Sequence, residues 1–525
     1  TEKEKKMALS TPSESPAVVV KEIDLTGGVP NVQSTTGATV INARWGPVDE
    51  RVLIANEADL VDRFGSPDTT TTFSFHRANM FLKYSSKMQT VRIIDSAACN
   101  ATSTTRSDNT TPTAASLKEV VKNETDFNSQ LSGLTTDKHT FVAKYPGALG
   151  NSLQVQLCLP GKHGDSAYTN WNFKGEFDAA PRTSDFAIKR GADSGNDEVH
   201  ALVIDKKGLF TGTANSVLER FAFLSVGSNA KDNAGSNIFI KDVINETSEY
   251  VWMINGDSDM NATVGSQAAF GTTIDSGDNF VRTSSTTMIG AKVAEISFDF
   301  DSGTDVSTLT DGTIMTGYDL FQDKDQVEID FLLAPGSTTT ASMTAITNHL
   351  VAMAANTRKD CVVCTSPARD DVVNINSAAT ITTNIVATAD TYTKSSYLVM
   401  DGNFLKIYDK FNDQFIEIPA SSSTAGIMAA TDLNRAPWFS PAGSRRGQYL
   451  GITAINYSPT KAQRDTLYKA GVNPIANIPG AGVILFGDKT KLARPSAFDR
   501  INVRRLFLVL ERAISRAAEQ VLFEF

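Results

Sequence analysis

The order of apolar and polar positions predicts that the chain begins, after a short arm, with an α/β unit. Residues 38–48, ATVINARWGPV, have the pattern of a strand that ends in a turn. Residues 57–65, EADLVDRFG, have the spacing of a short helix ended by Gly65, and residues 88–95, MQTVRIID, that of a second strand. Strands that alternate with a helix over such short distances are typical of α/β packing.

The pattern changes at residue 98, where Thr, Ser and Asn dominate the segment ACNATSTTRSDNTTPTAAS. Such residues compete with regular backbone pairing and predict a domain edge. Short strands with glycine-rich turns follow, which predicts an inserted β-rich domain over residues 98–204. Strands among Thr, Ser, Gly and Asp continue beyond residue 205, so we expect the body of the protein to be mainly β.

A second α/β pattern begins near residue 326. Residues 326–336 predict a strand, residues 344–360 an amphipathic helix and residues 361–371 another strand, which together indicate a parallel crossover unit. Further along, residues 458–471, SPTKAQRDTLYKAG, predict a helix with Ser458 as N-cap, Pro459 at its first position and Gly471 at its far end.

These patterns predict an α+β multidomain protein with a C-terminal α/β module and β-rich, barrel- or sandwich-like inserted domains. Residues 1–20 have no periodicity and form an expected N-terminal arm that packs with the C-terminal module. We assign 21–97 with 205–395 to a middle domain of α/β and sandwich-like character, 98–204 to an outer inserted domain, and 396–525 to the C-terminal domain.

The last helix pattern, RRLFLVLERAISRAAEQVLFEF, has two distinct faces. Arg505, Arg512 and Arg516 share one face. Arg512 and Arg516 are like charges one helical turn apart, and this pair is destabilising by roughly a few tenths of a kcal/mol unless an acidic group meets it. We expect this basic face to meet an acidic partner, although a solvated face partly relieved by Glu519 is the simpler alternative. The other face is predicted to be core, because its apolar residues recur at spacings of three and four: Leu506, Val509, Leu510, Ala513, Ile514, Ala517 and Val521.

Charge is distributed unevenly along the chain. From Arg435 onward there are 14 Lys+Arg against 6 Asp+Glu, a net charge of +8, so with a whole-chain charge of −10 the preceding residues carry −18. A basic module on an acidic body indicates an acidic partner, or like modules packed basic surface to acidic surface, or two surfaces that are simply solvated.

The candidate chemistry is weak. Cys361 and Cys364 have redox or zinc spacing, but the apolar Val-Val between them and the lack of a second pair favour core packing. His163, Asp165 and Ser166 are neighbours in a glycine-rich segment, where a working triad rarely forms. We therefore predict no catalytic, cofactor-binding or metal-binding residues and no enzyme activity. The acidic residues Asp323, Asp325, Glu328 and Asp330 are interpreted as a solvated edge.

No apolar run reaches the roughly 18 to 20 residues that span a bilayer, and no signal-peptide pattern is present in the sequence. The four cysteines are too few for a disulfide framework in a chain of 525 residues, so reduced thiols are expected. These features favour a product of the cytoplasm.

The C-terminal module resembles the tail sheath proteins of contractile-tailed bacteriophages of the T-even type. The resemblance lies in WFSPAGSRRG, in INYSPTKAQRDTLYKAGVNPIANIPGAGVILFGDKT and in ARPSAFDRINVRRLFLVLERAISRAAEQVLFEF. RWGPVDERVLIANEADLVDRFGSPD followed by VRIID is similar to the family's strand, turn, short helix and Phe-Gly stop. YSSKMQ stands where that family often has Asn-Gly-Gly, which departs from its pattern before the second strand.

The resemblance implies a structural subunit that polymerises in six-fold rings around a tail tube and contracts to drive the tube into the host. Its implied partners are further copies of itself, the tail tube protein, and baseplate and tail terminator proteins, with no nucleic acid and no membrane insertion. It places the protein in the virion tail after assembly in the host cytoplasm, with the C-terminal module innermost. Arg505, Arg512, Arg516, Arg445 and Arg446 are the expected residues of tube or subunit contacts.

Two alternatives stay open at this point. Sheaths of bacteriocins and secretion-type injection systems share the C-terminal module, although a single chain with large insertions favours a phage. A β-rich surface or adhesive protein fits the Thr/Ser/Asn composition but lacks a secretion signal. Because related sheath proteins continue past the corresponding helix, we also expect a further segment after Phe525, without which polymerisation weakens.

Overall fold

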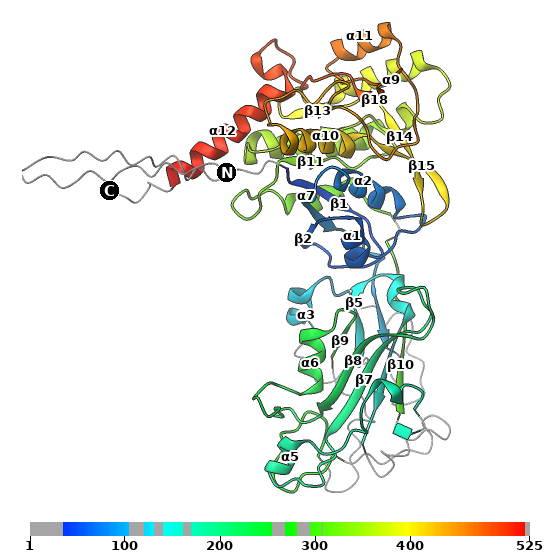
Figure 1. Ribbon diagram of the computed structural model, residues 1–525, viewed down its shortest axis with the longest axis vertical. Coiled ribbons are helices and arrows are strands. Elements are labelled where there is room, and N and C mark those ends of the chain that lie inside the picture. The colour runs from blue at the N-terminus through cyan, green and yellow to red at the C-terminus, as the bar shows by residue number, and fades with distance from the viewer. Residues whose placement is uncertain are drawn as a thin grey trace, which may run out of the picture.

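The computed structural model divides into two lobes, one built on a mainly parallel sheet with helices on both faces and one on an antiparallel sheet (Figure 1). It describes residues 35–103, 120–130, 140–160, 168–169, 171–254, 268–280, 295–306 and 308–519. The predicted N-terminal arm, residues 1–20, lies outside these ranges. A mixed α/β fold with several sheets confirms the broad fold class.

The first sheet has six strands in the order β13-β12-β11-β1-β3-β2, and all neighbours run parallel except β2 and β3. The predicted crossover unit is confirmed, since β11 pairs in parallel with β12 and α8 connects them. The strands are β1 (Gly37–Ile41), β2 (Arg51–Ile54), β3 (Met88–Arg92), β11 (Phe331–Leu333), β12 (Val362–Thr365) and β13 (Leu398–Met400).

Helices cover both faces of this sheet and enclose two separate cores (Figure 1). One core lies under α7 (Asp311–Asp319), α8 (Thr340–Ala352) with its continuation η5 (Met353–Arg358), and α9 (Ala378–Thr391). The other lies under α1 (Glu57–Phe64), α2 (Thr72–Leu82) and α10 (Ser421–Asn434). The prediction for residues 57–65 is confirmed, because α1 ends at Gly65, whose φ of 77° suits a residue without a side chain.

The second lobe contains a seven-stranded antiparallel sheet in the order β8-β7-β6-β10-β4-β5-β9. Helix α6 (Ile240–Thr247) packs on it, and the short helices α3 (Glu124–Gln130) and α5 (Asp185–Lys189) lie at its ends (Figure 1). The strands are β4 (Asn100–Ser103), β5 (Phe141–Pro146), β6 (Leu153–Cys158), β7 (Glu198–Asp205), β8 (Ser216–Ser225), β9 (Val251–Met253) and β10 (Glu295–Asp301).

This pairing differs from the division expected at residue 205. Strand β10 returns to pair with both β6 and β4, so the inserted sheet continues to residue 301 instead of ending near 204. The expected boundary at residue 396 also falls inside a sheet, because β13 at 398–400 is the edge strand of the six-stranded sheet. Composition changes mark where a segment becomes polar, but strand pairing between distant segments decides which residues share a domain.

The C-terminal residues add two small sheets to the first lobe. Strands β14 (Phe404–Asp409), β15 (Gln414–Pro419) and β16 (Ala454–Ile455) form one, and β17 (Ile475–Ile478) pairs with β18 (Gly482–Leu485) in the other. Helix α11 (Lys461–Lys469) is capped by Thr460, which forms a capping box with Gln463, so the predicted cap at Ser458 is wrong by two residues. Gly471 lies beyond the end of α11 with a φ of 73°, as predicted.

A buried arginine fixes the junction between the two lobes. Arg92, at the end of β3, is 1% exposed, and its guanidinium group donates hydrogen bonds to the carbonyl oxygens of Ala43 (2.9 Å), Gly46 (2.7 Å) and Pro146 (2.6 Å). The first two belong to the first lobe and Pro146 belongs to the inserted sheet. Trp45 adds edge-on contacts with Tyr145 and Phe210 of the inserted lobe. One charged side chain therefore holds backbone from both lobes.

Substitution of Arg92 by Met should destabilise the protein by about 3 kcal/mol, because three buried carbonyl groups lose a charged donor. The matched control is Arg220→Met, since exposed Arg220 donates to a single carbonyl, that of Glu176. Its effect should stay within about 0.5 kcal/mol. Urea unfolding followed by circular dichroism measures both, and equal effects would contradict the proposed role of Arg92.

A buried carboxyl group joins the C-terminal elements to the six-stranded sheet. Asp401 follows β13 and is 1% exposed. Its two oxygens accept hydrogen bonds from Ser366 (2.8 Å) and Thr424 (3.1 Å), and Thr424 in turn contacts the hydroxyl of Tyr449 at 2.9 Å. Burial raises the pKa of Asp401 to about 7, although these hydrogen bonds act in the opposite direction.

Because the pKa of Asp401 is higher in the folded state, this group stabilises the fold most at low pH, and that contribution is lost as pH rises through about 7. The free energy of unfolding of the wild type, relative to Asp401→Asn, should fall by about 3 kcal/mol between about pH 5 and pH 8. Urea unfolding of both proteins at the two pH values measures this difference. A constant difference would show that Asp401 does not titrate in this range.

Candidate interface at the C-terminal helix

Helix α12 (Ile501–Glu519) projects from the edge of the first lobe (Figure 1). Its buried residues are Ile501, Arg505 and Leu508, so contact with the body is limited to one narrow face. Ile501 and Leu508 join the core that lies under α2 and α10. The remaining contacts of this face are made by arginines.

Arg505 forms a buried ion pair with the acidic residue near the end of α10. Its guanidinium group bonds to both carboxylate oxygens of Asp432 and donates to the carbonyl of Met428 at 3.1 Å. The side chains of Arg505 and Asp432 are 6% and 3% exposed. The guanidinium carbon also lies 4.5 Å from the centre of the Phe331 ring, in cation–π geometry. This pair fixes the first half of α12 to α10.

Two further arginines fix the second half of α12 to the segment that leads into β11. Arg512 donates to Asp330 at 2.7 Å and to the carbonyls of Ile329 (3.2 Å) and Asp360 (3.1 Å). Arg516 pairs with Glu328. The interpretation as a solvated edge is therefore wrong for Asp330, which is 7% exposed, but it holds for Glu328, whose side chain is 58% exposed although it pairs with Arg516. The sequence analysis also assigned no role to Asp432, the partner of Arg505.

Of the acids that pair with the second half of α12, Asp330 is the more buried. Its second carboxylate oxygen accepts a hydrogen bond from the backbone N–H of Thr36 at 2.9 Å. Burial raises the pKa of the Asp330 carboxyl group, while the positive charge of Arg512 lowers it. Removing Arg512 alone would leave the burial effect without its main opposing charge.

The apolar face of α12 points away from the body, contrary to the prediction that it forms core. Phe507, Leu510 and Ile514 are 39%, 45% and 67% exposed. The arginine face occupies the position expected for the apolar face, because its three charges find acids within the same chain. The acidic partner expected for Arg505, Arg512 and Arg516 is thus intramolecular, and a tube or subunit contact of these residues stays a prediction.

The other two predicted interface residues lie in the loop between α10 and β16. Arg445 is exposed and, within the described part of the chain, makes no ion pair or hydrogen bond through its side chain. Arg446 is half-buried, donates to the carbonyl of Ser440 at 2.7 Å and lies over the ring of Phe439. Arg446 therefore holds the loop in shape, whereas Arg445 is available to a partner.

Large apolar side chains are exposed on several parts of the C-terminal module. Trp438 is 52% exposed, and its carbonyl accepts a hydrogen bond from Asn502 of α12 at 3.1 Å, which places it beside the base of that helix. Exposed apolar residues gathered in one module are typical of interaction surfaces. Besides the three on α12, the others in this module are Tyr408, Phe415, Leu433, Phe439, Leu450 and Phe486.

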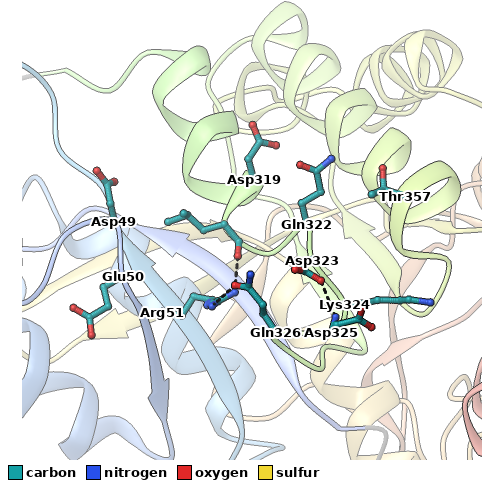
Figure 2. Close-up of a pocket in the computed structure, with 11 residues that line it drawn as sticks. Asp49, Glu50, Arg51, Asp319, Gln322, Asp323, Lys324, Asp325, Gln326 and Thr357 are labelled. Carbon is teal, nitrogen blue, oxygen red and sulfur yellow. Dashed lines mark hydrogen bonds between the residues drawn. The ribbon is translucent and has the colours of Figure 1, made fainter. Parts of the chain in front are cut away.

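An acidic hollow of about 860 Å³ lies between the start of β2 and the loop after α7. Figure 2 shows Arg51 among the residues that line it, bonded to the carbonyl of Leu320 (3.0 Å) and to Gln326 (2.9 Å). Five acids line the hollow against two bases, Arg51 and Lys324, so its net charge favours a basic partner. The acids are Asp49, Glu50, Asp319, Asp323 and Asp325.

The structural interpretation of the cysteines is confirmed. Cys361 and Cys364 are fully buried and belong to the two different cores on opposite faces of the sheet, so their thiols cannot meet. All four cysteines lie in the described ranges, and none of them forms a disulfide bond. Across the described ranges, no group of three His, Cys, Asp or Glu residues is placed to hold a metal ion, and no helix is long and apolar enough to cross a membrane. His163, Asp165 and Ser166 lie outside those ranges.

Comparison with known proteins connects this geometry to a family. Residues 316–491, from α7 to just beyond β18, match the profile of the phage tail sheath protein central domain. A tail sheath protein of Vibrio phage KVP40 is 29% identical over 97% of this chain and 87% of the relative, and the tail sheath protein of Enterobacteria phage T4 is 27% identical over 97% and 86%. Residues 316–491 therefore match the phage tail sheath family, and the chain is similar to tail sheath proteins along nearly its whole length.

A solved structure shares the fold of this chain. The sheath tail protein of Listeria innocua superposes with a TM-score of 0.50 at 13% sequence identity, covering 93% of this chain and 78% of the other. At that identity the likeness concerns the fold alone. The resemblance predicted from the C-terminal motifs is confirmed along nearly the whole chain by the two phage relatives.

The Arg512–Asp330 pair should behave as a buried ion pair in a double-mutant cycle. Arg512→Met should destabilise the protein by about 3 kcal/mol, because it leaves a buried carboxylate unpaired, and adding Asp330→Asn should recover about 2 kcal/mol of that loss. The amide oxygen introduced by Asp330→Asn can still accept the hydrogen bond from the Thr36 N–H. Urea unfolding of the four proteins gives the coupling energy.

The control cycle uses Arg63 and Asp59, an i,i+4 pair on α1 whose arginine side chain is 58% exposed. Its coupling energy should be only about 0.3–0.5 kcal/mol. Similar coupling in the two cycles would mean that the Arg512 pair does not hold α12 to the body.

Proposed function

We propose that this chain is a structural subunit of a contractile tail sheath, which polymerises around a tail tube and contracts to drive the tube through a host envelope. The observation that carries the proposal is its similarity, along 97% of its length, to proteins named tail sheath protein in two phages. The exposed apolar face of α12 supports it, since a projecting apolar helix requires a partner in the assembled state.

In this proposal the C-terminal module lies innermost and the inserted β-rich lobe, of barrel- or sandwich-like character, faces outward. Two features support that orientation. The module from Arg435 onward carries a net positive charge and exposed aromatic residues such as Trp438, Phe439 and Phe486, whereas the inserted lobe is the part that extends away from it (Figure 1). The partners are further copies of the chain in six-fold rings, the tail tube protein, and baseplate and tail terminator proteins. The role is mechanical, without catalysis.

Contacts between subunits in such a lattice must break and form again during contraction. Exposed charged pairs contribute only about 0.2–1 kcal/mol each, so they can exchange without a large barrier. The acidic hollow beside β2 and the guanidinium group of Arg445 have the chemistry for contacts of this kind. Large numbers of subunits acting together would still perform substantial mechanical work.

The inner position of the C-terminal module can be tested with matched apolar substitutions. Trp438→Ala should weaken assembly with the tube protein by about 2 kcal/mol, roughly 30-fold in the concentration at which sedimentable polymer forms. Leu209→Ala, at a 45% exposed residue of the inserted lobe, should have little effect. Sedimentation and electron microscopy of the full chain mixed with tube protein measure both.

Two charge-reversal variants, one on each lobe, repeat the test independently. Arg445→Glu should reduce assembly, most strongly at low ionic strength, whereas Arg190→Glu on the inserted lobe should not. If the two inserted-lobe variants impair assembly more than the two C-terminal variants, the proposed orientation is wrong. If no condition with tube protein yields hollow striated polymer from the unmodified chain, the sheath function itself is unsupported.

A sheath of a phage-derived injection system, such as a bacteriocin or secretion-type device, is the alternative function. The family match to the central domain suits either kind of sheath. The large inserted lobe in a single chain and the similarity to two phage proteins favour the phage tail.

A further inference from the structure

The apolar face of α12 forms a continuous stripe on the exposed side of the helix. Phe507, Leu510 and Ile514 are separated by three and four residues, so they follow one another along one side of the helix. Arg505 and Arg512 hold the opposite side against the body. No described residue covers Leu510 or Ile514 enough to exclude water from them.

The start of the described chain lies beside the second half of this helix. Thr36 and Asp330 exchange backbone and side-chain hydrogen bonds, since the Thr36 N–H donates to the Asp330 carboxylate and the Asp330 N–H donates to the Thr36 carbonyl at 2.8 Å. The same carboxylate accepts the bond from Arg512. The first 34 residues therefore join the folded body next to α12, because Thr36 and Arg512 bind the same carboxylate.

Those residues include residues 17–25, AVVVKEIDL, in which six of nine positions are apolar. From Leu25 to Thr36 the chain has 11 residues, which can span up to about 36 Å. Half the girth of a helix about 10–12 Å across is only about 17 Å. The segment can thus reach around α12 from its own anchor point without help from another molecule.

We propose that residues 17–25 cover the apolar face of α12 in the free subunit, within the same molecule. The anchor at Thr36 keeps the segment at a high effective concentration beside Phe507, Leu510 and Ile514, which favours this occupant over a second copy. The proposal deepens the proposed function and rests on it, because a covered face in the free subunit would prevent premature association until the sheath assembles.

Crosslinking of the full chain tests this directly. Val19→Cys combined with Ile514→Cys places thiols on the segment and at the centre of the apolar face. Val19→Cys combined with Ser515→Cys is the matched control, because Ser515 is exposed at the same height on another side of α12. The four native cysteines are buried and should not react. A short bismaleimide reagent is applied to dilute subunit, and products are separated by denaturing electrophoresis.

The 19/514 pair should form an intramolecular crosslink roughly tenfold faster than the 19/515 pair, independent of protein concentration. Crosslinked dimers at position 514 would show that a second copy covers the face and would overturn the proposal. Equal rates for the two pairs, or no crosslink at 514, would also overturn it. The measurement uses unassembled subunit, so its outcome is distinct from that of the assembly tests with Trp438.

Discussion

The ion pairs that hold α12 against the body decide which surface this subunit presents. A helix with one apolar and one basic face normally buries the apolar face, because each buried Leu or Ile contributes about 1.5–3 kcal/mol. Here Arg505, Arg512 and Arg516 each meet an acid of the same chain, and Arg505 adds a bidentate, almost fully buried geometry. With those acids fixed in place, rotating the helix would bury apolar groups but separate the arginines from their acids. Leaving a buried charge without its partner costs about 3–5 kcal/mol. The arginine face therefore packs inward.

The same reasoning explains why the junction between the lobes is built around a charge. The carbonyl groups of Ala43, Gly46 and Pro146 converge on one point and need a donor with several N–H groups in a fixed plane. Arg92 supplies that donor, and the ring of Trp45 fills the space beside it against Tyr145 and Phe210. A lobe held through backbone carbonyls keeps its orientation more strictly than one held by apolar contact alone.

The sequence was informative about local elements and weak on their orientation. Helix α1, the β11-α8-β12 crossover and the ends of α11 follow from periodicity and turn residues, which act over a few positions. Which face of α12 is buried depends on Asp432, Glu328 and Asp330, which are 73, 188 and 182 residues away from their arginines. One signal was present: arginines one helical turn apart, about 6 Å, match acids two residues apart in an extended segment, about 6.6 Å. Periodicity shows which residues share a face, but it does not show where that face finds a partner.

The uneven charge of the chain acquires a different meaning once the pairs are placed. The excess of +8 after Arg435 does not simply describe a basic surface, because Arg505, Arg512 and Arg516 are neutralised by acids of this chain. The cations left for partners include Arg445 on a loop and the exposed Lys461 and Lys469 of α11, and the module also exposes aromatic residues such as Trp438. A surface of this mixed kind binds through apolar area and is steered by charge. It can therefore form specific contacts while each charged contact stays weak enough to exchange.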